Sequence, residues 1–259
     1  MLLVIDVGNT NIKFGLYKGD KLCQSWRLSV KVPRTADELG IEISNMFKVG
    51  GVDMKDITGV IMSSVCPPLN YTVEHACHYY IGIKPMTVGT GIKTGLNVKY
   101  TNPQEVGADR IVNSVAAYKL YGGPCIVVDF GTATTFNLIS AKGEFMGGCI
   151  CPGIKSSLES LVSNTAKLTR VELTKPQSIV GKSTDANLQA GIIYGFTGLV
   201  KYIVQGFRKQ EGFENAKVVA TGGLSQLILS VEEEKILDIV DRSLTLKGLK
   251  IIYDMNKKQ

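Results

Sequence analysis

Several features that mark membrane, secreted or nucleic-acid-binding chains are missing from these 259 residues. No uncharged apolar stretch approaches the roughly 18 to 20 residues that span a bilayer, so we expect no membrane partner. The first apolar run, Leu2–Ile5, is short and ends at Asp6 without a basic segment before it, so we expect no signal peptide. The formal charge of +6 comes without a block of basic residues, so we expect no nucleic-acid partner.

Disulfide and zinc patterns are missing as well. The six cysteines show no framework spacing, and several lie in apolar runs where a reduced thiol packs as a small hydrophobic group. We therefore expect a cytoplasmic protein. The only two histidines, His75 and His78, flank Cys77 on a predicted helix at spacings that do not converge on a zinc ion.

What is present favours a globular α/β enzyme. Hydrophobic residues make up 44% of the chain, and 28 glycines suit many tight connections between strands and loops. The length allows one large domain or two modest ones with a cleft between them.

The first part of the chain reads as three antiparallel strands followed by alternating helices and strands. Turn residues separate the strands, and the first helix opens with an acidic first turn after Thr35. The predicted strands are Leu2–Ile5, Asn11–Tyr17, Leu22–Leu28, Ile57–Ser63 and Pro85–Val88, and the predicted helices are Thr35–Phe47, Leu69–Tyr80 and one that begins near Ala108.

The same order of elements begins again at Cys125–Asp129, which repeats the apolar run and aspartate of Leu3–Asp6. Strands at Thr135–Ser140 and Glu144–Cys149 would complete the copy, and a long helix is predicted within Ala190–Phe207. We therefore predict two related domains, residues 1–118 and residues 119–259.

Each copy places Asp, Gly and hydroxyl or amide side chains where a buried strand ends. In Asp6–Asn11, glycine permits close backbone approach, Asn and Thr can donate to phosphate oxygens, and Asp6 can hold a hydrated Mg²⁺. A plain β-turn is the alternative for one such segment. The second copy, Asp129–Thr135, favours phosphate binding, because two such hairpins could clamp a polyphosphate.

The segment Glu105–Arg110 opens a helix, where free amides and the positive end of the dipole suit a carboxylate ligand. By itself it also fits an acidic helix cap followed by a surface arginine. Lys13 could likewise reach a phosphate or simply lie on the solvated face of its strand.

The motifs together carry a resemblance. Asp6–Thr10, Gly107–Arg110, Asp129–Thr134 and Pro152–Ile154, with Ala220–Leu224 as an adenosine loop, resemble type III pantothenate kinases, within the actin, sugar-kinase and acetate-kinase superfamily. The resemblance implies an α/β fold of two RNase H-like (actin-like ATPase) domains, each a mixed sheet flanked by helices, with ATP in the cleft between them.

The resemblance also implies a reaction, the ATP-dependent phosphorylation of pantothenate to 4'-phosphopantothenate, which is the first step of coenzyme A biosynthesis. It implies Mg²⁺ and a monovalent cation, K⁺ or NH₄⁺, with Asp129 as the ligand of the latter, and a homodimer. The implied ATP-binding residues are Asp6, Val7, Gly8, Asn9, Thr10, Asn11, Ile12, Lys13 and Thr132. The implied substrate-binding residues are Tyr100, Gly107, Ala108, Asp109, Arg110 and Thr184, with Asp109 as general base, Arg110 at the acid end of pantothenate and Thr184 from the other subunit.

Two other readings stay open. A non-enzymatic transcriptional accessory factor also resembles this family, although Asp6, Asp109, Arg110 and Asp129 are all present here and no helix carries clustered Arg and Lys. A phosphotransferase acting on a sugar or a short-chain acid is the second, because the fold alone does not determine the acceptor.

Overall fold

The computed structural model describes residues 1–257, which form two compact units. Unit 1 contains Met1–Gly95, Asn102–Ala116 and the residues from Leu244 onward, and unit 2 contains Leu96–Thr101 and Ala117–Ser243. This division differs from the two contiguous domains predicted, because a short segment of the first half joins the second sheet and the C-terminal helix packs on the first.

The sheet of unit 1 has the order β3-β2-β1-β4-β5. Strand β1 pairs antiparallel with β2 and parallel with β4, β2 pairs antiparallel with β3, and β4 pairs parallel with β5. The strands are β1 (Leu2–Val7), β2 (Asn11–Lys18), β3 (Lys21–Ser29), β4 (Gly59–Ser64) and β5 (Met86–Thr87).

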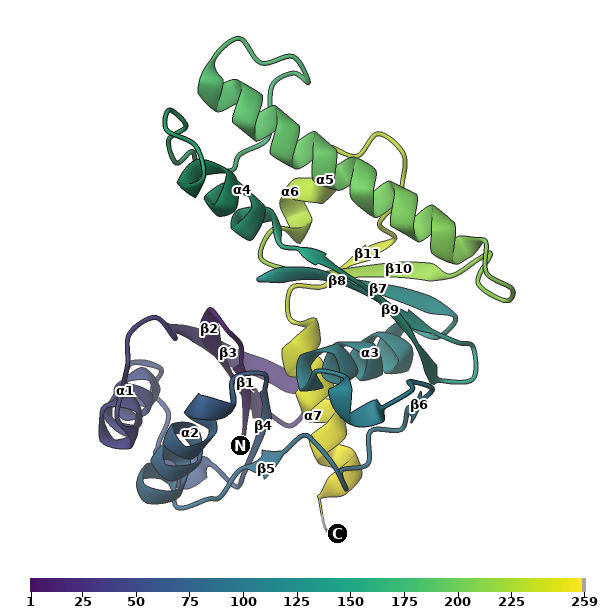
Figure 1. The fold of residues 1–259 in the computed structure, drawn as a ribbon. Coiled ribbons are helices and arrows are strands. Elements are labelled where there is room, and N and C mark those ends of the chain that lie inside the picture. Colours follow the sequence, from purple (N-terminus) through teal and green to yellow (C-terminus); the bar gives the residue numbers. More distant parts are fainter. Residues whose placement is uncertain (258–259) are drawn as a thin grey trace. The chain divides into compact units, whose positions relative to one another are not determined.

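Helices cover both faces of this sheet (Figure 1). One face packs its core with α1 (Ala36–Val49) and α2 (Asn70–Ala76), which a π-helical turn extends over Cys77–Ile81. The other face carries α7 (Leu244–Asn256), whose Gly248 lies against Val112 of α3 (Ala108–Tyr121). Short 3₁₀ turns at Met54–Asp56, Pro67–Leu69 and Pro103–Glu105 connect these elements.

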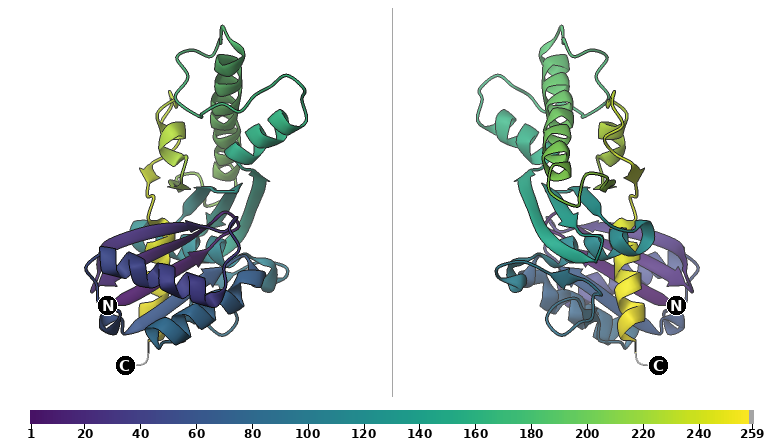
Figure 2. Two further views of the ribbon diagram at one scale, coloured as in Figure 1. Left: turned by 90° about the vertical axis from the view of Figure 1, so that its left-hand side faces the viewer. Right: turned by 90° about the vertical axis from the view of Figure 1, so that its right-hand side faces the viewer.

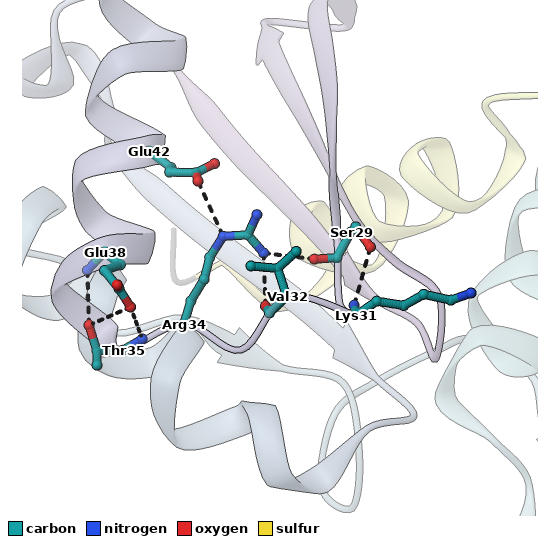
Figure 3. Close-up of polar contacts among 7 residues, drawn as sticks. All are labelled: Ser29, Lys31, Val32, Arg34, Thr35, Glu38 and Glu42. Carbon is teal, nitrogen blue, oxygen red and sulfur yellow. Dashed lines mark hydrogen bonds and ion pairs between the residues drawn. The ribbon is translucent and has the colours of Figure 1, made fainter.

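Hydrogen bonds define the connection from β3 to α1 (Figure 3). The guanidinium of Arg34 donates to the carbonyl oxygens of Ser29 at 2.7 Å and Val32 at 3.2 Å, and it pairs with Glu42 at 3.2 Å. Thr35 caps α1, since its hydroxyl accepts from the amide of Glu38 while the Glu38 carboxylate accepts from the amide of Thr35. The predicted start of this helix is confirmed.

The sheet of unit 2 has the order β11-β10-β7-β8-β9-β6. Strand β7 pairs antiparallel with β8 and parallel with β10, β8 pairs antiparallel with β9, and β10 pairs parallel with β11. The strands are β6 (Asn97–Val98), β7 (Cys125–Phe130), β8 (Ala133–Ile139), β9 (Glu144–Pro152), β10 (Lys217–Gly222) and β11 (Ile239–Val240).

Three helices share the core of this unit with the sheet (Figure 2). They are α4 (Ile154–Ser163), α5 (Thr184–Arg208) and α6 (Ser225–Leu229). Ile193, Phe196 and Val200 are buried on one side of α5, as its helical period predicts. The predicted long helix is confirmed, and it begins before Ala190.

The predicted repeat is confirmed by the two sheets. Apart from the added strand β6, the order β9-β8-β7-β10-β11 in unit 2 repeats the order β3-β2-β1-β4-β5 in unit 1, with the same parallel and antiparallel pairings.

Within residues 1–257, no helix has the length and apolar content that a membrane crossing requires.

Candidate functional site

A polar row crosses the middle of the sheet in unit 1. Asp6 on β1 lies opposite Lys13 on β2 and opposite Ser63 on β4. The Lys13 ammonium is 3.2 Å from one carboxylate oxygen of Asp6, and the Ser63 hydroxyl donates to the other at 3.0 Å. Because side chains alternate along a strand, this row lies on the face opposite Leu3, Ile5 and Val7, which enter the core with α1.

The loop Gly8–Thr10 follows this row. The Gly8 amide donates to the carbonyl oxygen of Asn11 at 3.0 Å, which closes a tight turn between β1 and β2. Asn9 and Thr10 are exposed, whereas Val7 and Ile12 on either side are buried. The predicted phosphate-binding segment therefore has buried, hydrogen-bonded ends and an exposed tip at Asn9 and Thr10.

The first turn of α3 carries Asp109. Its carboxylate folds back and accepts from the amide of Arg110 at 2.7 Å. A Cβ at Gly107 would lie only 2.7 Å from that carboxylate, so glycine leaves room for this conformation. Asp109 is partly buried, and Ala108 before it begins the helix.

The environment of Asp109 changes its acidity. Burial raises the pKa of Asp109 above the ordinary value for an aspartate, and the negative charge of Asp6 adds to that rise. The Arg110 amide and the cations of Arg110 and Lys13 act in the opposite direction. A carboxylate with a raised pKa is a stronger base than a free aspartate, which suits proton abstraction.

Arg110 is 7% exposed and points from the same turn. Its carbonyl oxygen accepts from the buried Ser114 hydroxyl at 2.7 Å, which secures the second turn of the helix. Unit 1 thus brings together three parts of the predicted site, namely the row at Asp6, the loop after it and the start of α3.

The second hairpin supplies the corresponding features in unit 2. Asp129 on β7 is half-buried and lies opposite Thr135 on β8 and Thr221 on β10, and Thr132 lies in the exposed loop between β7 and β8. The Ser156 hydroxyl donates to the carbonyl oxygen of Thr132 at 2.8 Å.

Two glycines let backbone pack against this hairpin. A Cβ at Gly153 would lie 2.2 Å from the carbonyl oxygen of Thr132, so any side chain there would displace the loop. Gly222 has a φ of +94°, and a Cβ there would lie 2.5 Å from the carbonyl oxygen of Phe130. Both positions require glycine, the second also because few other residues adopt a positive φ.

The remaining predicted residues of unit 2 lie on other elements. Tyr100 follows β6, and its ring centroid is 6.3 Å from that of Phe145. Thr184 is exposed in the first turn of α5, after the capping residue Ser183, whose hydroxyl accepts from the Ala186 amide at 3.2 Å. Ser183 is therefore the N-cap of α5.

A cavity of about 280 Å³ adjoins the predicted adenosine loop. Its walls come from α4, from the segment before α5 and from the residue that follows the two glycines of the loop. The lining residues are Lys155, Leu158, Glu159, Val162, Arg170, Val171, Glu172, Leu173 and Leu224. An apolar floor with charged residues at the rim is the usual composition of a small-molecule site.

Sequence reasoning missed Ser63 and Ser156, which contact the two hairpins. The only local signal for Ser63 is a hydroxyl at the end of a buried strand. Its contact with Asp6 depends on the pairing of β4 with β1, which the sequence does not display directly.

Solved structures with the same fold include two from bacteria. One is a Campylobacter jejuni protein described as belonging to a Baf family of transcriptional activators, with a TM-score of 0.58, 23% identity and 98% coverage of each chain. The other, described as a 2-dehydro-3-deoxygalactonokinase protein, comes from Sinorhizobium meliloti, with a TM-score of 0.61, 11% identity and coverage of 100% of this chain and 98% of that one. These likenesses show the sugar-kinase and actin-like ATPase fold alone, as predicted.

Sequence comparison identifies the family. The family model for type III pantothenate kinase matches residues 2–206. A type III pantothenate kinase from Bacillus cytotoxicus is 52% identical over 256 residues, which cover 99% of this chain and 97% of the relative. The chain therefore belongs to the type III pantothenate kinase family.

Proposed function

We propose that the chain transfers the γ-phosphoryl group of ATP to the primary hydroxyl of pantothenate, giving 4'-phosphopantothenate in the first step of coenzyme A biosynthesis. Family membership supports the reaction. The observation that carries the assignment of roles is the partly buried Asp109, whose raised pKa reflects burial and the charge of Asp6.

Asp109 is the general base in this proposal. The pantothenate hydroxyl oxygen attacks the γ-phosphorus, its proton passes to the Asp109 carboxylate, and the bond to the bridging oxygen breaks to release ADP. Because phosphoryl transfer depends mainly on positioning and charge neutralisation, Asp109 supplies only part of the rate. Arg110 binds the pantothenate carboxylate, while Tyr100, Gly107 and Ala108 line the pocket.

The nucleotide is bound by residues 6–13 and by Thr132. The exposed tip at Asn9 and Thr10 offers donors to phosphate oxygens, and the Lys13 ammonium offers a positive charge. We also assign the cavity beside Leu224 to the nucleotide, because it adjoins the predicted adenosine loop.

The kinase family implies Mg²⁺ together with ATP. Within residues 1–257, no group of three or more His, Cys, Asp or Glu side chains could hold a metal ion unaided. That fits Mg²⁺, which keeps several waters and binds through one or two carboxylates and the phosphates of a substrate. We assign Asp6 to it, and the bound ion would neutralise charge on the phosphates.

A monovalent cation, K⁺ or NH₄⁺, completes the proposal. We assign Asp129 as its ligand, because Asp129 follows the buried part of β7 and is half-buried next to the exposed loop that carries Thr132. The cation would add positive charge near the phosphates that Thr132 contacts.

We further propose a cytoplasmic homodimer in which Thr184 reaches the substrate pocket of the other subunit. One side of α5 exposes Gly191, Gly195 and Gly198, followed by Tyr202, which is 80% exposed. A Cβ at any of these glycines would meet no atom within 4 Å, so this side could admit a second helix closely. The spacing of the four residues places them on one helical face.

A coupled assay of ADP release tests the reaction. The purified protein is given MgATP, KCl and pantothenate, beside wells with a sugar, acetate or no acceptor, and the series is repeated with NaCl. Pantothenate-dependent turnover that collapses without K⁺ supports the acceptor and the cation role. Turnover with a sugar or acetate but not with pantothenate would show that pantothenate is not the acceptor. If no well released ADP, the result would favour a regulatory binding protein.

A further inference from the structure

Ser63 makes a buried contact with the residue assigned to magnesium. It is 0% exposed, and its hydroxyl donates to one carboxylate oxygen of Asp6 at 3.0 Å. The other oxygen faces Lys13, whose side chain is 34% exposed. Asp6 therefore has one fully buried partner, Ser63, and one partly exposed partner, Lys13.

The pairing of strands explains this contact. Asp6 is in register with Ser63 across the parallel pair β1 and β4. The neighbours of Ser63 on β4 alternate, so that Val60 and Met62 enter the core with α1 while Ser63 points to the opposite face. Valine has a higher β-strand propensity than serine and would pack better at a buried strand position. The serine at this position is therefore explained by the hydrogen bond of its hydroxyl to Asp6.

Unit 2 repeats the arrangement at the corresponding strand. Asp129 is in register with Thr221 on β10, which is the parallel neighbour of β7 and the counterpart of β4. Thr221 is 2% exposed. The antiparallel partner differs between the copies, being Lys13 in one and Thr135 in the other. The hydroxyl residue beside the aspartate is thus the feature that both copies share.

We propose that Ser63 is a positioning residue for phosphoryl transfer, whose hydroxyl holds the Asp6 carboxylate in the orientation that binds the magnesium nucleotide. The terminal torsion of an aspartate has a broad energy well, so a carboxylate without this bond can rotate. In its absence both oxygens can turn to Lys13, and that ion pair then competes with the metal. The inference rests on the proposed function, because it assigns Asp6 to the magnesium of the nucleotide.

Three variants test the proposal. Ser63→Ala removes the donor, Ser63→Cys keeps the side-chain size with a weak donor, and Ser63→Thr keeps the hydroxyl. Ser64→Ala is the matched control, because Ser64 ends the same strand and its hydroxyl accepts from the amide of Cys66 instead. Thermal unfolding of each variant shows whether it folds.

The first readout is binding without catalysis. Calorimetry measures the Kd of ADP with and without Mg²⁺. For Ser63→Ala and Ser63→Cys we expect the Kd of MgADP to rise about ten- to a hundredfold, as for loss of a hydrogen bond to a charged group, while metal-free ADP changes less than about twofold. Ser63→Thr and Ser64→Ala should bind MgADP about as wild type does. If Ser63→Ala fails to fold, the MgADP affinity of Ser63→Cys tests the proposal in its place.

The second readout is turnover. We expect Ser63→Ala to raise the KM for MgATP and lower kcat, with the KM for pantothenate unchanged and partial recovery at high Mg²⁺. The proposal is overturned if Ser63→Ala and Ser63→Cys bind MgADP as Ser64→Ala does, or if they lose affinity for ADP equally with and without Mg²⁺. A wild-type protein that binds MgADP but phosphorylates no acceptor would refute the proposed function. The MgADP affinities of the Ser63 variants would still test the proposed role of Ser63.

Discussion

Asp109 lies close enough to Asp6 for the two charges to interact, although Asp109 is in the first turn of α3 and Asp6 is next to the last residue of β1. Burial raises the pKa of Asp109, Asp6 raises it further, and Lys13, which is paired with Asp6, lowers it. The ion pair at β1 therefore sets part of the basicity of the proposed general base. Its two members act on Asp109 with opposite sign.

The first prediction separates these two charges. In Asp6→Asn the pKa of Asp109 should fall, because a negative neighbour is removed, and in Lys13→Met it should rise, because a positive neighbour is removed. The measurement is ¹³C NMR of the Asp109 carboxyl as a function of pH. Shifts of the same sign in both variants would contradict the electrostatic account.

The second prediction concerns Asp109→Asn. It should lower kcat by about 10²- to 10⁴-fold, the usual contribution of a general base. It should also raise the melting temperature at pH 8, because a carboxyl whose pKa is higher in the folded protein than in the unfolded chain loses stability as pH rises between those two values.

Differential scanning calorimetry from pH 3.5 to pH 8 checks that second part. The difference in melting temperature between Asp109→Asn and wild type should be small below the pKa that Asp109 has in the unfolded chain. It should widen as pH rises through the pKa of Asp109 in the folded protein. Asp56→Asn, at an exposed aspartate, is the control for replacing an aspartate by asparagine. A variant that keeps near-normal kcat would remove Asp109 from the mechanism.

The third prediction concerns the last turn of α3. The Tyr121 hydroxyl donates to Asp241 at 2.8 Å, and Asp241 is 7% exposed. Tyr121→Phe should destabilise unit 2 by about 1–3 kcal/mol, because a buried acceptor loses a donor. Urea unfolding measures this loss, with Tyr79→Phe, at an exposed tyrosine, as control.

The same pair predicts a dependence on alkaline pH. Burial, with the bond to Asp241, raises the pKa of Tyr121 to about 12 from 10.0. The folded state therefore retains the proton more strongly, so its advantage over the unfolded chain is present below pH 10 and is lost as pH rises to about 12. In Tyr121→Phe this part of the alkaline loss should disappear.

The fourth prediction tests the exposed side of α5. Gly198→Arg should convert a dimer to a monomer without unfolding the protein, because its side chain would enter open space in one subunit but collide at a close helix–helix contact. Light scattering after size-exclusion chromatography measures the mass. Gln210→Arg, which adds the same charge at an exposed position beyond the helix, should leave the mass unchanged.

The parts of this fold that repeat locally could be read from the sequence. The run before Asp6 and its copy before Asp129 predicted two strands in equivalent places, and both sheets confirm it. The helix α7 was not predicted, although Leu244, Leu249 and Ile252 are buried along it, because no local signal shows that residues from Leu244 onward return to the first sheet.

Contacts that depend on long-range pairing were the harder part of the site. Asp6 could be chosen from its motif, but Ser63 lies 57 residues away and reaches it only because β4 joins β1 in parallel. Strand β6 has two residues, too few for a periodic pattern, and it is defined by its pairing with β9. The places of Ser63 and of β6 in the fold are determined by strand register, which the residue types alone do not reveal.

The fifth prediction concerns the six thiols, all of which are free. Burial raises the pKa of Cys77 and of Cys125 to about 12, so at pH 8 neither carries an appreciable fraction of the reactive thiolate. Cys23 is exposed and should react first with a disulfide reagent such as DTNB. Ser in place of Cys23 should remove that fast phase, and six thiols should react in denaturant. Rapid labelling of Cys77 in the native protein, mapped by mass spectrometry, would show that the core of unit 1 opens readily, since the buried thiol can ionise only when water reaches it.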